Sequence, residues 1–410
     1  MRKSVVIIGG GAAGLMAAVT AAQQGHGVLL LERNEKLGKK LYLTGKGRCN
    51  VTNLCAPDAF MQNVVRNPRF LYAALTAFPP QKMIDTLDAL GCPTVTERGN
   101  RVFPKSRKAS DVTRAFARRM EELGVAVRLN ARVQALQAEG GAVQGVVLEN
   151  GEHIAASAVI VCTGGVSYPS TGSTGDGYRL LAGCGHRIVP PKPALCGLIS
   201  EEGWIRELQG LSLKNVRLTL TDGKKTLFAE IGEMLFTHRG ISGPLVLTAS
   251  SLMAGRKGLS LSLDLKPGLS EEQLSQRVLR DLVKAGKKQM LSVLRGLFPE
   301  SLAIAMAALA GIGPRLPACE LGKTARLKLV ALTKALPLPV TGPEPIEEAV
   351  ITAGGADVKE FSPSTMESKL VKGLYAAGEV LDVDALTGGF NLHIAFATGH
   401  LAAMAAGNEE

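Results

Sequence analysis

Residues 4–14 read SVVIIGGGAAG, a β-branched run that leads into a glycine-rich turn. The run Ser4–Ile8 is typical of a buried parallel strand. Gly9, Gly11 and Gly14 follow in the spacing G-x-G-x-x-G, and alanine-rich sequence then continues as a helix. The first glycine permits a tight turn, the second lets the backbone approach a pyrophosphate, and the third lets the helix pack closely on the strand. The stretch therefore predicts a helix N-terminus that binds nucleotide phosphates.

A second predicted strand, Val28–Leu31, ends in Glu32, eighteen residues after Gly14. An acid at this position accepts hydrogen bonds from a ribose. Strand, glycines, helix, strand and acid in register form a far more specific signal than the glycines alone. The pattern predicts a dinucleotide and leaves FAD and NAD open. Arg33 follows the acid, but an acid in the ribose position argues against NADP.

The composition is that of a soluble globular protein of two or three domains, with 410 residues, 46% apolar and 20% charged. Seven scattered cysteines without a C-x-x-C pair argue against a disulfide framework, a zinc site or a dithiol redox motif. No apolar run reaches the length of a membrane span, and the N-terminal apolar stretch fits a nucleotide-binding turn better than a signal peptide. We therefore expect a cytoplasmic protein with no metal site and no membrane partner.

The net charge of +11 is unevenly distributed. Residues 97–119 contain eight Lys and Arg residues and two acids. Residues 269–335 contain eleven Lys and Arg residues and five acids. Basic surfaces suit phosphate-bearing ligands or nucleic acid. Solvated helix faces with a basic bias are the alternative interpretation.

The C-terminal segment favours FAD over NAD. The predicted strand Leu374–Ala377 runs into Gly378 and Glu379, and a helix begins near Asn391 after a pair of glycines. This arrangement matches the far half of a flavin site, where the acid and the glycine backbone meet the ribityl-pyrophosphate. The positive end of the helix then favours negative charge on the reduced flavin. A third strand, Ala158–Cys162, also ends in a glycine turn.

Proline-rich segments at 190–197 and 336–345 mark the two ends of a middle region. Within it, alternating runs such as 216–222 and 259–265 predict antiparallel strands. A helical pattern follows from Ser270.

These motifs occur in one order together with TGKGRCNVTN (44–53), LFTHRGISGP (235–244) and GEVLDVDALTGGFNLHIAFATG (378–399). In this order they resemble the BaiN/YhiN-type FAD-dependent oxidoreductases, relatives of the fumarate-reductase and glutathione-reductase flavoproteins. The resemblance implies an α/β fold with a Rossmann-like FAD-binding domain of glutathione-reductase type and tightly bound FAD. It also implies that an inserted β-barrel domain with a helical subdomain interrupts the flavin domain. Family members are proposed to reduce C=C bonds of steroid-like bile-acid intermediates, and one relative oxidises aminoacetone.

Combined with the proline-rich boundaries, the resemblance gives three predicted parts. The FAD-binding domain comprises 1–192 plus 346–410, the barrel-like insert 193–268 plus 331–345, and the helical subdomain 269–330. No second complete dinucleotide fingerprint is visible, so NAD(P)H, if it is the reductant, must visit the flavin transiently.

The expected FAD contacts come from the glycine turns, the two acids, the loop after Glu32 and neighbouring segments. They are Gly9, Gly11, Ala12, Ala13, Gly14, Glu32, Arg33, Lys40, Gly45, Gly47, Arg48, Cys49, Asn50, Val133, Thr163, Gly164, Gly165, Gly378, Glu379, Asp382, Gly388, Gly389, Asn391 and Leu392.

Two residues are candidates for catalysis. Cys49 is either a redox or charge-transfer thiol beside the flavin or a small inert buried residue. His238 is either a proton donor opposite the flavin or a histidine that hydrogen-bonds its own turn. His393 and His400 are interpreted as packing or capping residues.

The resulting hypothesis is an FAD enzyme that transfers a hydride between NAD(P)H, the flavin and a small organic substrate of C=C or amine type. Two alternatives stay open. One is an RNA-modifying flavoprotein, and the other is a non-enzymatic flavin-binding redox sensor or partner-binding module. The sequence does not predict an oligomeric state.

Overall fold

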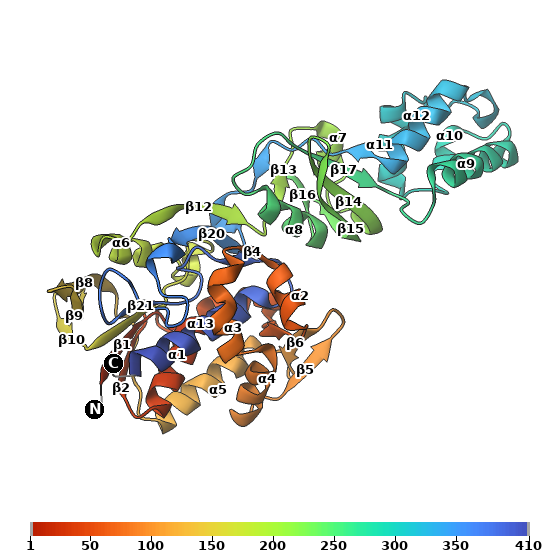
Figure 1. The fold of residues 1–410 in the computed structure, drawn as a ribbon. Helices are drawn as coiled ribbons and strands as arrows, with labels where there is room; N and C mark the ends of the chain where they lie inside the picture. The colour runs from red at the N-terminus through yellow and green to blue at the C-terminus, as the bar shows by residue number, and fades with distance from the viewer. Residues whose placement is uncertain (1–2, 408–410) are drawn as a thin grey trace. The chain divides into compact units, whose positions relative to one another are not determined.

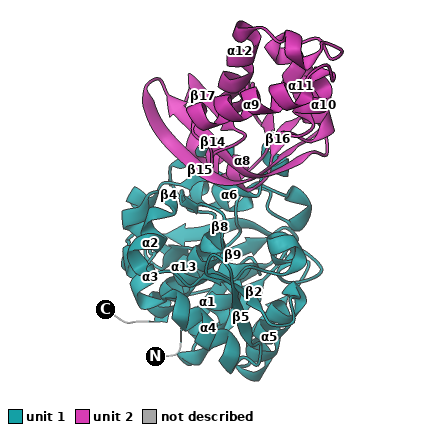
Figure 2. Ribbon diagram, turned by 90° about the vertical axis from the view of Figure 1, so that its right-hand side faces the viewer, with its two compact units in different colours: residues 1–194, 345–410 teal, residues 195–344 magenta. Residues whose placement is uncertain are grey.

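The computed structural model describes residues 3–407, in two compact units. Unit 1 contains the chain up to Ala194 and from Pro345 onward, and unit 2 is Leu195–Glu344 (Figure 2). Each unit has its own hydrophobic core. Unit 2 is therefore inserted between two segments that together build unit 1.

Unit 1 is built on a five-stranded sheet in the order β21-β11-β1-β2-β7, and all four neighbouring pairs are parallel (Figure 1). The strands are β1 (Ser4–Ile8), β2 (Gly27–Leu31), β7 (Ala126–Arg128), β11 (Ala158–Val161) and β21 (Leu374–Ala376). Every residue of β11 and β21 is buried, which is why these strands read as continuous apolar runs.

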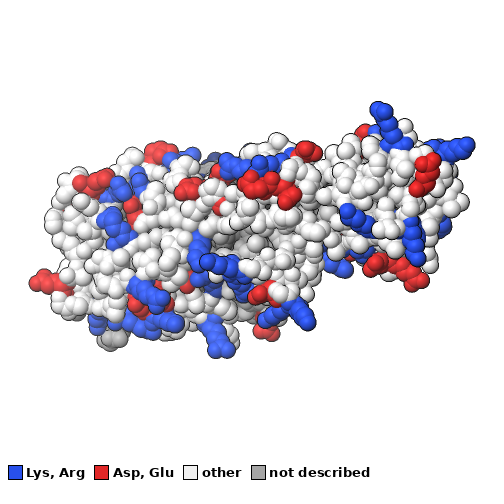
Figure 3. All heavy atoms as spheres, turned by 90° about the horizontal axis from the view of Figure 1, so that it is seen from above, with Lys and Arg blue, Asp and Glu red and all other residues white. Residues whose placement is uncertain are grey.

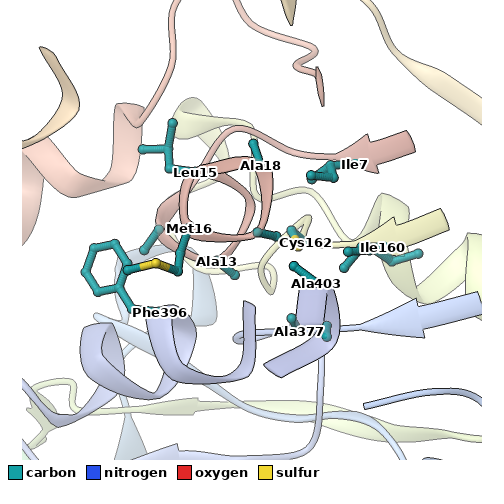
Figure 4. Close-up of a cluster of buried hydrophobic side chains, with 14 of the residues drawn as sticks. Ile7, Ala13, Leu15, Met16, Ala18, Ile160, Cys162, Ala377, Phe396 and Ala403 are labelled. Carbon is teal, nitrogen blue, oxygen red and sulfur yellow. The ribbon is translucent and has the colours of Figure 1, made fainter. Parts of the chain in front are cut away.

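Helix α1 (Ala12–Gln23) connects β1 to β2 and packs against α13 (Phe390–Gly407). Small residues allow this close approach, because a Cβ atom at Gly399 would lie 2.3 Å from the backbone oxygen of Ala13. Figure 4 shows Met16 of α1 beside Phe396 of α13. The first and last segments of unit 1 thus share one core around the sheet.

Smaller elements surround this sheet. The further strands of unit 1 are β3 (Thr52–Asn53), β4 (Val64–Arg66), β5 (Thr94–Glu97), β6 (Arg101–Pro104), β8 (Val133–Glu139), β9 (Ala142–Leu148), β10 (His153–Ala155), β12 (Ile188–Ala194), β20 (Ile351–Ala356) and β22 (Asp384–Ala385). The further α-helices are α2 (Pro57–Gln62), α3 (Tyr72–Ala77), α4 (Pro80–Ala89), α5 (Ala109–Glu122) and α6 (Asp176–Gly183). Antiparallel pairing of β4 with β22 and of β12 with β20 ties early segments of the chain to late ones.

Unit 2 contains a seven-stranded sheet in the order β18-β17-β14-β15-β16-β13-β19. Its strands are β13 (Leu198–Ile199), β14 (Ser212–Asp222), β15 (Lys225–Phe236), β16 (Gly240–Ser242), β17 (Leu259–Asp264), β18 (Leu336–Pro337) and β19 (Gly342–Pro343). Within the described chain no hydrogen-bonded pair joins β18 to β19, so the sheet is open and the predicted β-barrel is not confirmed. Alternation correctly predicted strands within β14 and β17, but it carries no information on closure.

The helices of unit 2 are α7 (Gly203–Glu207), α8 (Pro244–Met253), α9 (Glu271–Ala285), α10 (Met290–Leu294), α11 (Glu300–Ala310) and α12 (Lys323–Lys334). Helix α9 begins with a capping box, in which Ser270 and Gln273 satisfy each other's backbone N–H groups. Leu274, Val278 and Leu282 follow at four-residue spacing and are buried on one face. Across residues 3–407, no helix has the length and apolarity that crossing a membrane requires.

Candidate cofactor site

The turn after β1 leaves open space in front of helix α1. A Cβ atom at Gly14 would lie 1.9 Å from the backbone oxygen of Gly9, so the packing of the protein itself requires this glycine. Gly11 differs: its φ of −82° suits any residue, and a Cβ atom there would meet nothing within 4 Å. Helix α1 starts without a side-chain cap. Its first N–H groups therefore have no side-chain acceptor, as expected where a helix N-terminus binds phosphate.

Three predicted glycine turns meet at the carboxyl ends of neighbouring strands. Thr163, Gly164 and Gly165 follow β11, and a Cβ atom at Gly9 would lie 2.6 Å from the oxygen of Cys162. Gly378 follows β21, and a Cβ atom there would lie 3.0 Å from the Cβ of Ala13. Ligands of open α/β sheets bind at such an edge. Ala12 and Ala13 form the first turn of α1 at this edge.

Glu32 is buried at the end of β2 and holds the turn in place. Its carboxylate accepts hydrogen bonds from the backbone N–H of Gly10 at 2.7 Å and of Asn34 at 2.8 Å. Arg33 instead forms an ion pair with Asp176 at 2.9 Å. Hydrogen bonding from Arg132 is the main cause that lowers the pKa of Asp176, so this acid stays charged. Arg33 is therefore held by Asp176 of the protein itself. It follows Glu32, the acid that is predicted to bind the ribose.

Lys40 and Glu379 form the centre of a polar cluster. The Nζ atom of Lys40 lies 2.8 Å from a carboxylate oxygen of Glu379 and 2.7 Å from Oγ of Ser167. The backbone N–H of Thr352 donates to the same carboxylate at 2.8 Å. A Cβ atom at Gly165 would lie 2.4 Å from Oγ1 of Thr352, so this cluster needs a glycine there. Sequence reasoning missed Ser167 and Thr352, although Thr352 lies in the segment where the chain re-enters unit 1.

The loop 39–50 folds into short helical turns with left-handed residues at Gly45, Lys46 and Gly47. Arg48, a predicted FAD contact, has partners within the protein. Its guanidinium lies 3.1 Å from the Glu97 carboxylate and 4.3 Å from the centre of the Phe103 ring.

Cys49 is completely buried, and burial raises the pKa of its thiol to about 12. A thiol is nucleophilic and redox-active mainly as the thiolate, which this environment suppresses. The structure therefore favours the interpretation of Cys49 as an inert buried residue.

The loop between β21 and α13 is fixed by side chains on both sides. Asp382 accepts a hydrogen bond from Nε of Arg66 at 2.8 Å and from Asn67 at 3.1 Å. Asn391 accepts from the backbone N–H of Ala385 at 2.8 Å and donates to its carbonyl at 2.7 Å. These side chains of Asp382 and Asn391 thus shape the loop. Leu392, which follows Asn391 in the first turn of α13, is half-buried.

Gly389, just before α13, is also required by the packing, since a Cβ atom there would lie 2.5 Å from the oxygen of Thr52 and 2.8 Å from Oδ1 of Asn50. Gly388 has a φ of +127°. His393 is fully buried, bonded to Thr52 and to the Phe78 carbonyl at 3.0 Å each, and burial lowers its pKa to about 4. This agrees with its interpretation as a packing residue.

Buried polar side-chain atoms without a hydrogen-bond partner concentrate around this edge of the sheet. In the described part of the chain they are Asn50 Oδ1, Thr163 Oγ1, Tyr178 OH, both carboxylate oxygens of Asp384, and the more distant Gln24 Oε1. Such atoms normally have partners, so their concentration fits a missing polar ligand. Asp384 is the most strongly affected: burial raises its pKa to about 7, against the opposing effect of Arg66, whose Nε lies 3.8 Å away.

Two predicted residues lie outside this cluster. Val133 is buried at the start of β8. His238 is exposed in the turn between β15 and β16 of unit 2, where Thr237 Oγ1 accepts hydrogen bonds from the next backbone N–H groups. A proton-donor role for His238 stays a prediction.

The chain is similar to known proteins over nearly its whole length. The family model of the HI0933-like protein Rossmann domain matches residues 3–405. The 3-dehydro-bile acid delta(4,6)-reductase of Clostridium scindens is 32% identical over 98% of both chains. The ribosomal RNA dihydrouridine synthase of Escherichia coli is 30% identical over 97% of this chain and 96% of its own.

Among solved structures, a 3-ketosteroid-delta4-(5alpha)-dehydrogenase from Rhodococcus jostii RHA1 aligns with a TM-score of 0.51 and 16% identity. The alignment covers 100% of this chain and 97% of the dehydrogenase. At this identity the likeness shows the fold, and it confirms the predicted Rossmann-like α/β architecture.

Proposed function

Because the chain belongs to the HI0933-like family of FAD-dependent oxidoreductases, we propose that it reduces a carbon–carbon double bond conjugated to a carbonyl group, with NAD(P)H as reductant. The names of two relatives support this chemistry. A delta(4,6)-reductase of a 3-dehydro bile acid and a dihydrouridine synthase both saturate a double bond that is conjugated to a carbonyl. The proposed reaction is what these two otherwise different substrates share.

The residues at the sheet edge would hold FAD. The open space at Gly11 supports the assignment, because the start of α1 has no side-chain cap and its N–H groups could bind a pyrophosphate there. Glu32 would face the adenosine ribose, and Glu379 with Lys40 would face the ribityl chain. Bound FAD supplies the hydride acceptor and donor of the reaction.

Two features of the protein would support flavin chemistry: the dipole of helix α13 and the low reactivity of the buried Cys49 thiol. If the flavin pyrimidine lies at the start of α13, the positive end of this helix would stabilise the reduced form. Burial raises the pKa of the Cys49 thiol to about 12, which disfavours the reactive thiolate, so hydride transfer through the flavin is the expected route.

Anaerobic mixing of the purified protein with NADH and, separately, NADPH tests the proposal. We expect one of them to bleach the flavin absorbance near ~450 nm, and the reduced protein to be reoxidised by an enone such as a 4-ene-3-ketosteroid or by a uridine-containing RNA. A flavin that dithionite reduces but neither nicotinamide does would refute NAD(P)H as reductant. Reoxidation by neither acceptor would refute the substrate class.

An RNA base as substrate is the second candidate, favoured by the cations of α9–α12. Arg277 and Arg295 form ion pairs with Asp281 and Glu300. The remaining exposed cations of this region pair with no carboxylate within residues 3–407. They are Arg280, Lys284, Lys287, Lys288, Arg315, Lys323 and Lys328.

Backbone hydrogen bonds gather some of these cations. Ala318 donates to the carbonyl of Lys288, and Met290 donates to that of Leu316, each at 2.8 Å, which places Arg315 near the end of α9. Exposed cations without a carboxylate partner suit a phosphate backbone. In Figure 3 basic and acidic side chains are otherwise interspersed over the face shown.

Reversing four of these charges tests an RNA substrate. We expect the variant to bind a fluorescein-labelled hairpin RNA of about 30 nucleotides at least ~10-fold more weakly, with a salt slope reduced by about one per lost phosphate contact. The substitutions are Lys284→Glu, Lys287→Glu, Lys288→Glu and Arg315→Glu. The matched control reverses Arg98, Arg101, Lys105 and Lys108 of unit 1. Equal losses in both variants would show unspecific charge attraction and remove this argument for RNA.

A further inference from the structure

The buried Glu32 carboxylate accepts three hydrogen bonds from residues 3–407. Its Oε2 atom accepts from the backbone N–H of Gly10 at 2.7 Å. Its Oε1 atom accepts twice from Asn34, from the backbone N–H at 2.8 Å and from the side-chain Nδ2 at 2.7 Å. A carboxylate offers about four acceptor sites, two on each oxygen. One site therefore stays open, and it is on Oε2.

The side-chain amide of Asn34 is itself held by a second segment of the chain. Its Nδ2 also donates to the backbone carbonyl of Thr171 at 3.0 Å, across 137 residues of sequence. Its Oδ1 lies 3.4 Å from Nζ of Lys39. The reverse orientation of the amide would place Oδ1 against two other oxygens, the Glu32 carboxylate and the Thr171 carbonyl. The amide therefore has one favourable orientation, in which both of its N–H groups are used.

Gly172 leaves the room that this amide needs. It has a φ of +99°, and a Cβ atom there would lie 2.5 Å from Nδ2 of Asn34. Gly172 opens the run GSTGDGY (172–178), a glycine-rich segment between β11 and α6. A side chain at Gly172 would displace the amide from its position between Glu32 and Thr171.

Two further contacts hold the same segment against the loop that follows β2. Arg33 pairs with Asp176 at 2.9 Å, and Nζ of Lys40 lies 2.7 Å from Oγ of Ser167. Both contacts lie close in sequence to the contact between Asn34 and Thr171. The folded chain thus fixes Asn34 from both sides, and Asn34 in turn fixes the Glu32 carboxylate.

We propose that Asn34 is a positioning residue for the adenosine ribose of FAD, and that it directs the open acceptor site of Glu32 Oε2 to a ribose hydroxyl. This role rests on the FAD site proposed above. The last torsion of a glutamate side chain has only a weak intrinsic preference, so the three N–H donors select the orientation of the carboxylate. Without Nδ2 of Asn34 the carboxylate loses one of the two bonds that occupy Oε1, and its orientation is less well defined.

Calorimetric titration of the flavin-free, full-length protein with ADP and with 2′,3′-dideoxy-ADP tests this role. The second ligand keeps both phosphates and lacks the ribose hydroxyls. We expect the parent protein to bind ADP at least ~10-fold more tightly, because a hydrogen bond to a charged group contributes that much. Asn34→Ala should weaken ADP binding at least ~10-fold and change dideoxy-ADP binding less than ~2-fold.

Two further variants separate the donor from the shape of the side chain. Asn34→Asp keeps the shape but places a carboxylate oxygen beside Glu32, so it should weaken ADP binding at least as much as Asn34→Ala does. Asn150→Asp is the matched control, because Asn150 is exposed in unit 1 and its Oδ1 only accepts from the backbone N–H of Glu152 at 3.0 Å. It adds the same charge and should leave the affinity for both ligands unchanged.

Dideoxy-ADP also reports whether the phosphate end of the site is intact in a variant that is less stable. Equal losses of both ligands in Asn34→Ala would show a structural role and overturn the proposal. Parent-like ADP binding by Asn34→Asp, or a parent protein without preference for ADP, would also overturn it. A parent protein that binds neither ADP nor FAD would refute the cofactor site together with this role. Failure to reduce an enone would refute the proposed reaction and leave these binding ratios unaffected.

Discussion

Gly11→Val is expected to abolish FAD retention and to leave the fold intact. A side chain at this position would meet no protein atom within 4 Å, and the backbone φ of −82° suits valine. The valine would instead occupy the space where the pyrophosphate approaches the helix. We expect the flavin content of the purified variant to fall from about one per chain to near zero, with apo-protein stability within ~1 kcal/mol of the parent. Absorbance and urea unfolding of the flavin-free proteins measure these two quantities.

Gly14→Val is the matched contrast three residues away. A Cβ atom at Gly14 would lie 1.9 Å from the oxygen of Gly9, so the backbone must move. This variant should lose ~3 kcal/mol or more of stability, and its flavin with it, because overpacking at a strand–helix contact acts on the whole unit. If Gly11→Val kept its flavin, the pyrophosphate would not lie at this turn and the assignment of the site would be wrong.

The part of the site that the sequence predicted is the part whose geometry is local. Gly9, Gly14 and Glu32 act through turns and strands within one β-α-β unit, so their spacing carries the information. Ser167 and Thr352 are different, because they reach the Glu379 carboxylate across separations of 212 and 27 residues. Contacts between residues so far apart leave no periodic pattern in the amino-acid sequence.

Competition between partners also limits prediction. Arg48 stands beside glycines in a loop that suits phosphates, but Glu97, 49 residues later, pairs with it, and Phe103 lies under the guanidinium. In unit 2, alternating residues predict which segments are strands, but closure depends on which edges pair. Edge strands β18 and β19 pair with β17 and β13.

Asp384→Asn is expected to stabilise the protein in alkaline solution and to change little in acid. Both oxygens of the buried Asp384 carboxyl lack hydrogen-bond partners, and its pKa rises from 3.8 to about 7 in the folded protein. Arg66 opposes this rise, whereas Asp382 and Glu379 add to it. Because the folded state holds the proton more tightly than the unfolded state, the parent loses stability as pH increases from about 4 to about 7.

The asparagine removes that loss because it is neutral at every pH. At 1.36 kcal/mol per pKa unit, the variant should gain about 4 kcal/mol at pH 8.5 and about 1 kcal/mol at pH 4.5, measured by urea unfolding. Asp382→Asn is the control, since it breaks the 2.8 Å ion pair with Arg66 and should destabilise at both pH values. An equal effect of Asp384→Asn at the two pH values would show that the Asp384 carboxyl is charged in the folded protein. Arg66, whose Nε lies 3.8 Å from a carboxylate oxygen of Asp384, would then neutralise that charge.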